Sequence, residues 1–406
     1  MASPRKRIIW LLATLILVSL GAFVYFVHPI GVYKSVAYTA LPATSVDSTQ
    51  TTQAPGVPVS TTSTDASEAQ IPVTHIKTPT PVKAIYLSSW VAGVPKYRDP
   101  LIKMVDDTEL NAVVIDVKDS TGRISFPVND PTLASYGSVE KRIPDIRGLI
   151  NELHQKNIYV IGRVAVFQDP YMTKARPQWA ITKKSDGTPW KDQKGLTYLD
   201  PANKDVYPYI VSIAHEAYAD GFDEINFDYI RYPSDGNLKD IDYRLAPGKT
   251  RSDNLEDFFK YLNTNVKSPD DIPMSADLFG LTTEASDDMG IGQVWEKAYP
   301  YFDYLDPMIY PSHYAPGYDN YKNPAQYPSQ VITRALAGAI KKTKAINGDV
   351  NKIRPWLQDF NLGAVYTAAM VKDQTKATYD QGLTSWLMWD PANKYTPSAF
   401  ELDPNH

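Results

Sequence analysis

The sequence of 406 residues predicts an α/β fold: a (β/α)₈ TIM barrel preceded by an N-terminal transmembrane helix and a disordered linker. From residue 82 onward, short β-branched or aromatic runs alternate with longer helical patterns, which indicates parallel strands joined by helical crossovers. Eight repeats in about 320 residues fit the size of such a barrel. An open doubly wound sheet is the alternative, but no Gly-x-Gly-x-x-Gly follows any strand.

Eight segments have the composition of buried strands. They are 82–88, 112–117, 158–166, 224–229, 273–278, 304–309, 353–358 and 382–388. Helical patterns lie between them, and several begin near Pro, Asp or Asn, as helices often do. The clearer ones are 100–110, 143–156, 205–220, 254–266, 327–343 and 367–381.

A long apolar run precedes the barrel. Residues 8–27 could cross a hydrocarbon core of ~30 Å as a helix, and the basic tip 1–7 comes before them. The positive-inside rule then leaves the tip in the cytoplasm. A cleaved secretory signal is the alternative, but the run exceeds the usual length of about 7–15 residues. Both interpretations place the body outside the cytoplasm, so we expect a single-pass, membrane-anchored protein of the cell surface or envelope.

The segment 28–81 predicts a linker. From residue 41, about half of its residues are Thr, Ser or Pro, a composition that cannot offset chain entropy by burial. Its proline content makes an extended tether. Residues 82–406 are then the catalytic domain.

Composition excludes several classes of function. The net charge is −5 and no basic block follows the N-terminus, so we expect no nucleic-acid partner. There is no cysteine, which excludes disulfides, thiolate metal sites and a Cys nucleophile. The 27 Tyr and 8 Trp suit a sugar-binding cleft, because sugar rings stack on aromatic faces, although folded cores also use Tyr.

Polar residues follow most of the predicted strands, at the end where barrels of this class place their chemistry. From the second strand to the eighth they include Asp116, Lys118, Arg163, Asp228, Arg231, Asp277, Tyr310, His313 and Trp389. Carboxyl groups on adjacent strands, with Arg, Tyr and Trp among them, are typical of a glycosidase. Four other aspartates are better explained as helix caps or turn residues than as catalytic groups: Asp119, Asp169, Asp359 and Asp390.

The most informative segment is 220–233, which reads Asp-Gly-Phe-Asp-Glu-Ile-Asn-Phe-Asp-Tyr-Ile-Arg-Tyr-Pro. It closely resembles the fourth-strand motif of a glycoside hydrolase domain family of bacteria and archaea, long known only as a domain of unknown function. Residues 82–87 and 111–118 look like its first two strands, and 198–201 like its third-strand loop. The resemblance covers nearly all of 82–400 and implies a TIM-barrel glycosidase without naming a substrate.

More distantly, the family is similar to α-amylase-type barrels, whose fourth-strand Asp is the nucleophile of a retaining mechanism. Asp228 matches that position. The fifth strand offers Asp277 where those enzymes have a Glu acid/base, and Asp359 follows the seventh strand. The same segment is also similar to chitinase barrels, but Ile230 stands at the position of their acid Glu, so substrate-assisted chemistry is not supported.

Strand alternation sends Asp228 to the face opposite Phe227 and Tyr229. Because apolar Phe227 suits the side that meets the helices, we expect Asp228 to face the lumen at the barrel mouth. Arg231 is its predicted partner, since a nearby cation keeps a carboxylate ionised and nucleophilic. A structural Asp–Arg pair is the alternative.

A general acid must hold its proton near neutral pH, which requires an apolar pocket or a neighbouring carboxylate. Asp277 is the first candidate, with Asp116 and Asp306 in reserve. The expected substrate contacts, or else supporting hydrogen-bond partners, are Asp116, Lys118, Arg163, Arg231, Tyr310 and His313. Candidate sugar platforms are Trp90, Trp190 and Trp389, each of which could instead pack in the core.

The sequence thus predicts a two-carboxylate, retaining glycoside hydrolase that acts on a polysaccharide as a monomer without a cofactor. A carbohydrate-binding barrel without activity stays open, because fold does not imply chemistry. So does metal-dependent hydrolysis or deacetylation. Of six histidines only His313 lies at a strand end, so we expect no His-based metal site.

Overall fold

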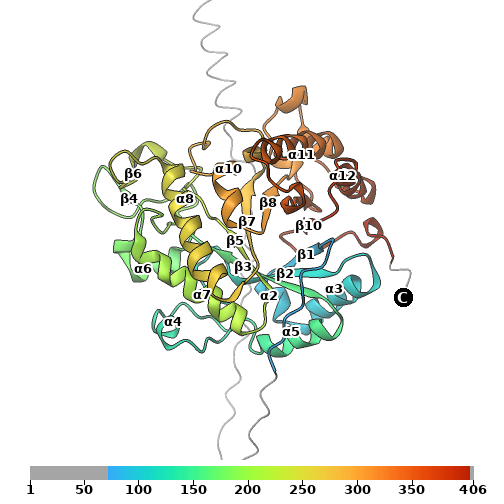
Figure 1. Ribbon diagram of the computed structural model, residues 1–406, viewed down its shortest axis with the longest axis horizontal. Coiled ribbons are helices and arrows are strands. Elements are labelled where there is room, and N and C mark those ends of the chain that lie inside the picture. The colour runs from blue at the N-terminus through green and yellow to red at the C-terminus, as the bar shows by residue number, and fades with distance from the viewer. Residues whose placement is uncertain (1–71, 403–406) are drawn as a thin grey trace, which may run out of the picture. The chain divides into compact units, whose positions relative to one another are not determined.

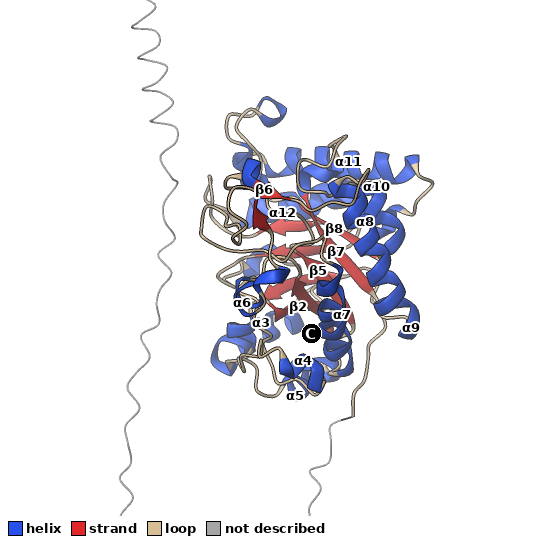
Figure 2. Cartoon of the chain, turned by 90° about the vertical axis from the view of Figure 1, so that its left-hand side faces the viewer, coloured by secondary structure: helices blue, strands red, loops and turns tan. Residues whose placement is uncertain are grey.

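The computed structural model describes residues 72–402, and its main strands close into one barrel with helices around it (Figures 1 and 2). The barrel strands are β1 (Lys83–Leu87), β2 (Ala112–Lys118), β3 (Tyr159–Ala165), β5 (Glu224–Asp228), β7 (Met274–Phe279), β8 (Tyr304–Met308), β9 (Trp356–Gln358) and β10 (Trp386–Trp389). Neighbours pair in parallel and in sequence order, and β10 pairs with β1 to close the ring. The predicted eight-stranded barrel is confirmed.

All six predicted helices occur, with shifted ends. They are α3 (Pro95–Asp107), α5 (Ile146–Gln155), α7 (Tyr207–Ala219), α8 (Arg251–Leu262), α11 (Pro328–Ala345) and α12 (Ala368–Asp380). The first begins earlier than residue 100 because Pro95 takes the first helical position, where its missing N–H is not needed. Within residues 72–402 there are also short α-helices: α2 (Ser89–Ala92), α4 (Pro131–Ser135), α6 (Pro170–Ala175), α9 (Ser268–Asp270) and α10 (Trp295–Ala298).

A small antiparallel pair outside the barrel was not predicted. It joins β4 (Thr182–Lys183) to β6 (Ile241–Asp242). Strands of two residues are too short to show a period in the sequence. The pair ties the loop that follows β3 to the loop that follows β5, so it braces one side of the barrel mouth.

The core has two parts, one on each face of the strands. Ile225 and Phe227 of β5 belong to the large apolar cluster between strands and helices, as alternation predicts. A smaller cluster fills the lumen, with Val114, Ile161 and Leu387 among its members. The lumen of this barrel is therefore packed with side chains.

The described chain begins before the predicted domain boundary at residue 82. Its first residues cross the amino-terminal end of the barrel, where the Ile76 N–H donates to Asp223 Oδ1 at 2.6 Å and the Thr78 hydroxyl lies 2.9 Å from the Tyr159 hydroxyl. His75 stacks on Tyr218 with ring centroids 3.9 Å apart. The part of the predicted linker from residue 72 on therefore packs against the barrel.

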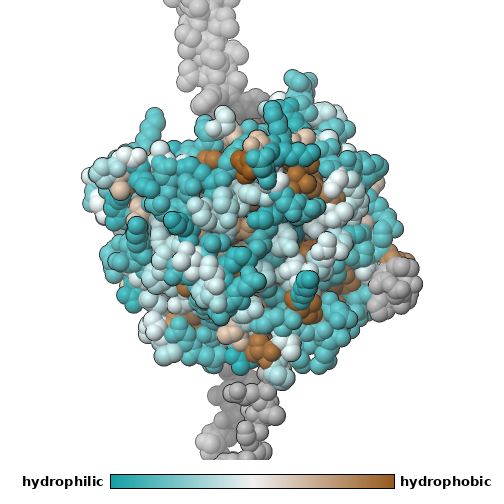
Figure 3. Space-filling view, in the orientation of Figure 1, coloured by the Kyte–Doolittle hydropathy of each residue, from teal (hydrophilic) through white to brown (hydrophobic). Residues whose placement is uncertain are grey.

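The predicted membrane span, 8–27, lies outside the described residues. No helix within 72–402 combines the length and apolarity needed to cross a bilayer. The face of the molecule in Figure 3 is mostly hydrophilic, with hydrophobic side chains in scattered patches.

Candidate active site

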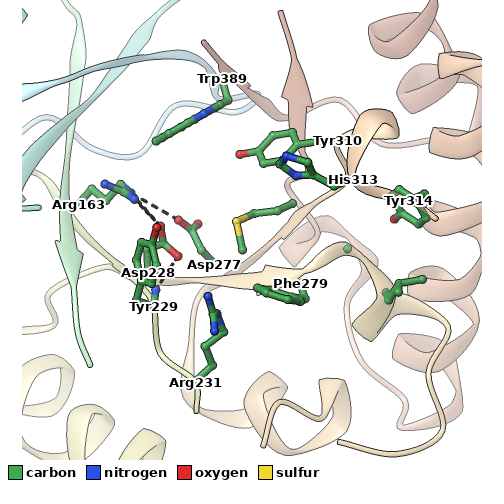
Figure 4. A pocket seen from close by; sticks show the side chains of 13 residues that line it. Arg163, Asp228, Tyr229, Arg231, Asp277, Phe279, Tyr310, His313, Tyr314 and Trp389 are labelled. Atoms are coloured by element: carbon green, nitrogen blue, oxygen red, sulfur yellow. Dashed lines mark hydrogen bonds and ion pairs between the residues drawn. The ribbon is translucent and has the colours of Figure 1, made fainter. Parts of the chain in front are cut away.

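A cavity of about 360 Å³ lies at the carboxyl ends of the barrel strands (Figure 4). Its volume is in the range of small-molecule sites. Its position is the one at which barrels of this class carry their chemistry. The lining residues are Arg163, Asp228, Tyr229, Arg231, Asp277, Phe279, Gly280, Leu281, Met308, Tyr310, His313, Tyr314 and Trp389.

Asp228 ends β5 and is held by an arginine from the neighbouring strand β3. Its Oδ2 accepts from Arg163 Nε at 3.1 Å and from Nη2 at 2.5 Å. Arg163 also donates to Asp116 Oδ1 at 2.6 Å, so one guanidinium binds two carboxylates. The prediction that Arg231 pairs with Asp228 is wrong, because strand pairing brings residue 163 to the carboxylate.

Tyr229 lines the cavity, and the prediction that it faces the helices is wrong. Its φ of +50° lies in the left-handed region, which is rare for a residue with a bulky side chain. The strand therefore stops at Asp228, and alternation no longer applies to the next side chain. The turn also lets the Tyr229 N–H donate to Asp228 Oδ1 at 2.5 Å. Strained backbone of this kind is common at functional sites.

Asp277 lies on β7, beside β5, and its carboxyl group is buried. Oδ1 accepts from Asn226 Nδ2 at 2.9 Å and from Trp356 Nε1 at 2.7 Å, while Oδ2 lies 4.0 Å from Arg163 Nε. Burial raises the pKa of Asp277 well above its usual range, and the charge of Asp228 adds to this shift while Arg163 opposes it. Asp277 is therefore the group in the cavity that is arranged to hold a proton.

The carboxyl groups of Asp228 and Asp277 both lie near the guanidinium of Arg163. Asp228 Oδ2 and Asp277 Oδ2 lie 3.1 and 4.0 Å from the same Arg163 Nε, so they are at most about 7 Å apart. The register pairs Phe227 with Ala276, which makes the next residues, 228 and 277, direct neighbours across the strands. Asp228, which Arg163 holds in place, thus lies beside Asp277, whose pKa is raised.

A family model described as "Putative glycosyl hydrolase domain" matches residues 84–395. The chain belongs to this family. Membership makes it an enzyme of the glycosidase class, and the resemblance predicted from segment 220–233 is confirmed. No curated protein matches the chain.

Solved structures resemble this glycosyl hydrolase domain. A hypothetical protein from Ruminiclostridium thermocellum is 32% identical over 51% of this chain and 98% of its own, with a TM-score of 0.44. The PgaB (BpsB) glycoside hydrolase domain from Bordetella bronchiseptica is 14% identical over 80% and 99%, with a TM-score of 0.58. An α-galactosidase from Thermus thermophilus is 12% identical over 81% and 61%, with a TM-score of 0.49. The Bordetella domain supports the barrel fold.

Two predicted contact residues of the glycosyl hydrolase domain lie outside the cavity lining. Asp116 is buried behind Arg163 and accepts from the Tyr86 hydroxyl at 2.6 Å. Lys118 is fully buried and pairs with Asp169 at 3.0 Å, so it has no access to a substrate. The register shifts between 116 and 118, and this bulge turns Lys118 away from the face that Asp116 occupies.

Asp306, a reserve acid, belongs to a buried network below the cavity. Both it and Glu224 bind Arg354, with Asp306 Oδ1 3.0 Å from Nε and Glu224 Oε2 3.2 Å from Nη1. Burial raises the pKa of Asp306 to about 6. Because Asp306 does not line the cavity, Asp277 is the better placed of the two.

Trp389, Tyr310 and His313 line the cavity, as predicted for substrate contacts. Trp389 stacks on Tyr86 with ring centroids 4.0 Å apart. The His313 ring lies edge-on to Tyr310 at 5.2 Å, and burial lowers the pKa of His313, so it is neutral near pH 7.

The other two candidate platforms lie elsewhere. Trp190 is buried and donates to the Asn237 carbonyl at 2.9 Å, so the core-packing alternative is correct for it. Trp90 is 58% exposed and lies against Arg142, outside the cavity lining. The expectation that Asp169 caps a helix is confirmed, since it accepts from the Met172 N–H at the start of α6.

Several lining residues were not among the predicted contacts. They are Tyr229, Phe279, Gly280, Leu281, Met308 and Tyr314. Most lie one to four residues beyond a predicted site residue or strand end. Including the first few residues after each strand end among the candidates would have found them. Within residues 72–402, no group of three or more His, Asp or Glu side chains is arranged to hold a metal ion.

Proposed function

We propose that this glycosyl hydrolase domain cleaves the glycosidic bonds of a polysaccharide, with Asp277 as general acid and base and Asp228 as nucleophile. The observation that carries the proposal is the pair itself. Burial raises the pKa of Asp277, and Asp228 is held by the Arg163 guanidinium and a backbone N–H. The two groups lie at neighbouring strand ends in one cavity. Two carboxyl groups in different environments are the usual acid and nucleophile of a glycosidase.

The reaction has two steps. In the first, Asp277 gives its proton to the glycosidic oxygen while an oxygen of Asp228 attacks the anomeric carbon, and the bond to the leaving sugar breaks. In the second, Asp277, now a carboxylate, takes a proton from water. The resulting hydroxide attacks the anomeric carbon, which releases the sugar and frees Asp228. Arg163 orients Asp228 throughout.

The strand geometry supports retention of the anomeric configuration. Neighbouring strands lie about 4.8 Å apart, and side chains of paired residues point the same way. Retaining enzymes hold their carboxyl groups about 5–5.5 Å apart, whereas inverting enzymes need about 6.5–9.5 Å to fit a water. Asp228 Oδ2 and Asp277 Oδ2 are at most about 7 Å apart, so most of the separations found in inverting enzymes are too long for this pair.

The location of the reaction is part of the proposal. The apolar run 8–27 after a basic tip, followed by the Pro-rich tract to residue 81, supports an anchored enzyme outside the cytoplasm. The proposed substrate is accordingly a polysaccharide of the envelope or the surroundings.

The test is hydrolysis of a polysaccharide panel by the purified full-length chain, compared with Asp228→Asn and Asp390→Asn. Asp390 is the matched control, because it also follows a barrel strand but accepts from the Ala392 N–H in a turn. We expect release by the wild type and the control only, with NMR showing retention in the first product. Release by Asp228→Asn would remove Asp228 from the mechanism. Glycan binding without release by any form would indicate a binding module.

A further inference from the structure

Arg231 is a buried cation in the cavity wall, and no carboxylate of the part of the chain that the structure describes pairs with it. It is 8% exposed, and its Nη1 donates to the Tyr232 carbonyl at 3.0 Å and to the Ser234 hydroxyl at 3.3 Å. No Asp or Glu oxygen within residues 72–402 lies within 4.0 Å of its nitrogens. Figure 4 shows its guanidinium pointing into the cavity, with no dashed line to a carboxylate.

The other buried arginines are different. Within the described part of the chain, four arginines are buried: Arg142, Arg163, Arg231 and Arg354. Each of the other three binds two carboxylates, at closest distances between 2.5 and 2.9 Å. A buried charge is unfavourable unless it is paired. Arg231 is therefore the exception among the buried arginines of residues 72–402, and its guanidinium faces the cavity.

The two carboxyl groups that line the cavity, Asp228 and Asp277, have other partners. Asp228 is bound by Arg163 through two hydrogen bonds. Asp277 accepts from Asn226 and Trp356 through Oδ1, and its Oδ2 lies 4.0 Å from Arg163 Nε. Within the described residues, neither carboxyl group of the cavity pairs with Arg231, so its guanidinium is available to an anionic group of a bound ligand.

The surroundings of Arg231 hold its guanidinium for such a contact. The group lies 4.6 Å from the ring centroid of Phe279 and 5.4 Å from that of Tyr229. Aromatic rings contact the flat face of a guanidinium and leave the N–H groups at its edge free. Those N–H groups can donate two parallel hydrogen bonds to one carboxylate. Tyr314, which lines the same cavity near Gly280, has a buried hydroxyl without a partner in residues 72–402.

We propose that the substrate is an acidic glycan, in which a sugar unit near the cleaved bond carries an anionic group that Arg231 binds. A uronic acid carboxylate fits the guanidinium edge best, and a sulfate ester offers the same charge. This inference rests on the proposed function only in taking the cavity as the substrate site.

The test measures binding of the full-length chain to acidic polymers and to their neutral counterparts. The probes are polygalacturonate, alginate and hyaluronate, each beside its carboxyl-reduced form, and dextran sulfate beside dextran. Wild type is compared with Arg231→Gln. Arg176→Gln is the matched control, because Arg176 also lies against two aromatic rings, Tyr136 at 4.9 Å and Trp179 at 5.1 Å, but outside the cavity.

We expect wild type and Arg176→Gln to bind at least one acidic polymer about 10-fold or more tightly than its neutral form. Arg231→Gln should bind the two forms equally. A preference for dextran sulfate alone would identify the anion as a sulfate. Equal binding of acidic and neutral forms by wild type, no binding of any acidic probe, or an unchanged preference in Arg231→Gln would each overturn the inference.

Product release is followed separately in the same samples. Charge-selective binding without hydrolysis would remove the proposed function and leave the acidic ligand in place. Hydrolysis of neutral glycans alone would support the proposed function and overturn the role of Arg231.

Discussion

The substitution Asp277→Asn removes the proton that catalysis needs, and its effects on activity and on stability can be measured separately. Asparagine has nearly the same shape, and its amide oxygen can accept the bonds from Asn226 Nδ2 at 2.9 Å and Trp356 Nε1 at 2.7 Å. It cannot act as a general acid, and it cannot ionise. We expect activity to fall by about 10²–10⁴-fold, the usual contribution of a general acid.

The effect on stability follows from the raised pKa of Asp277. Burial raises this pKa above the ordinary value of 3.8, so in the intervening pH range the folded chain keeps a proton that the unfolded chain releases. The stabilisation from protonated Asp277 is therefore complete below pH 3.8 and is lost as pH rises toward the folded pKa. Each pH unit in that range lowers the free energy of unfolding by about 1.4 kcal/mol relative to the Asn variant. Over two such units the difference is about 2.8 kcal/mol.

Urea unfolding at pH 5, 6 and 7, followed by tryptophan fluorescence, measures this slope. The Asn variant should become more stable relative to wild type as pH rises, although it is inactive. The activity of wild type should fall on the alkaline side as Asp277 ionises. Parallel stability curves for the two proteins would refute the reasoning, because Asp277 would then be ionised in the fold and unable to act as the resting acid.

Three further substitutions test the assignments around the cavity. Lys118→Met removes the ion pair of Asp169 and should destabilise the fold by about 3–5 kcal/mol in urea unfolding. The KM of the folded variant should not change. A raised KM would show that Lys118 contacts the substrate after all. Asp306→Asn removes one of the two partners of Arg354 and should lower the urea midpoint, the opposite of Asp277→Asn. Trp389→Ala removes an aromatic wall and should raise KM about 2–10-fold with kcat less affected; an unchanged KM would show that no sugar stacks there.

The barrel was predictable because its signals are local. Each strand is a short run of β-branched and aromatic residues, and the eight runs alternate with amphipathic helices whose periods are visible in the sequence. Knowing the fold class then located the site, because the carboxyl ends of parallel strands meet at one end of a barrel. Asp228 and Asp277 could be named as cavity residues from their positions at two consecutive strand ends.

The predictions that were wrong depend on contacts or backbone angles that one segment does not contain. The partner of Asp228 is Arg163, 65 residues away in sequence, and not Arg231, three residues away. Tyr229 enters the cavity because its backbone takes a positive φ. Lys118 turns away because of a register shift within β2.

The sequence by itself determined the barrel, the strand ends that meet at its mouth and the family of glycosyl hydrolase domains, because periodicity and motif are properties of consecutive residues. Only the tertiary structure decided which charges are paired. It assigned Arg163 to Asp228 and Asp116, put Asp277 in an environment that raises its pKa, and left Arg231 without an ion-pair partner within residues 72–402. Burial and pairing of charges depend on neighbours from different strands, and those neighbours exist only after the barrel has closed.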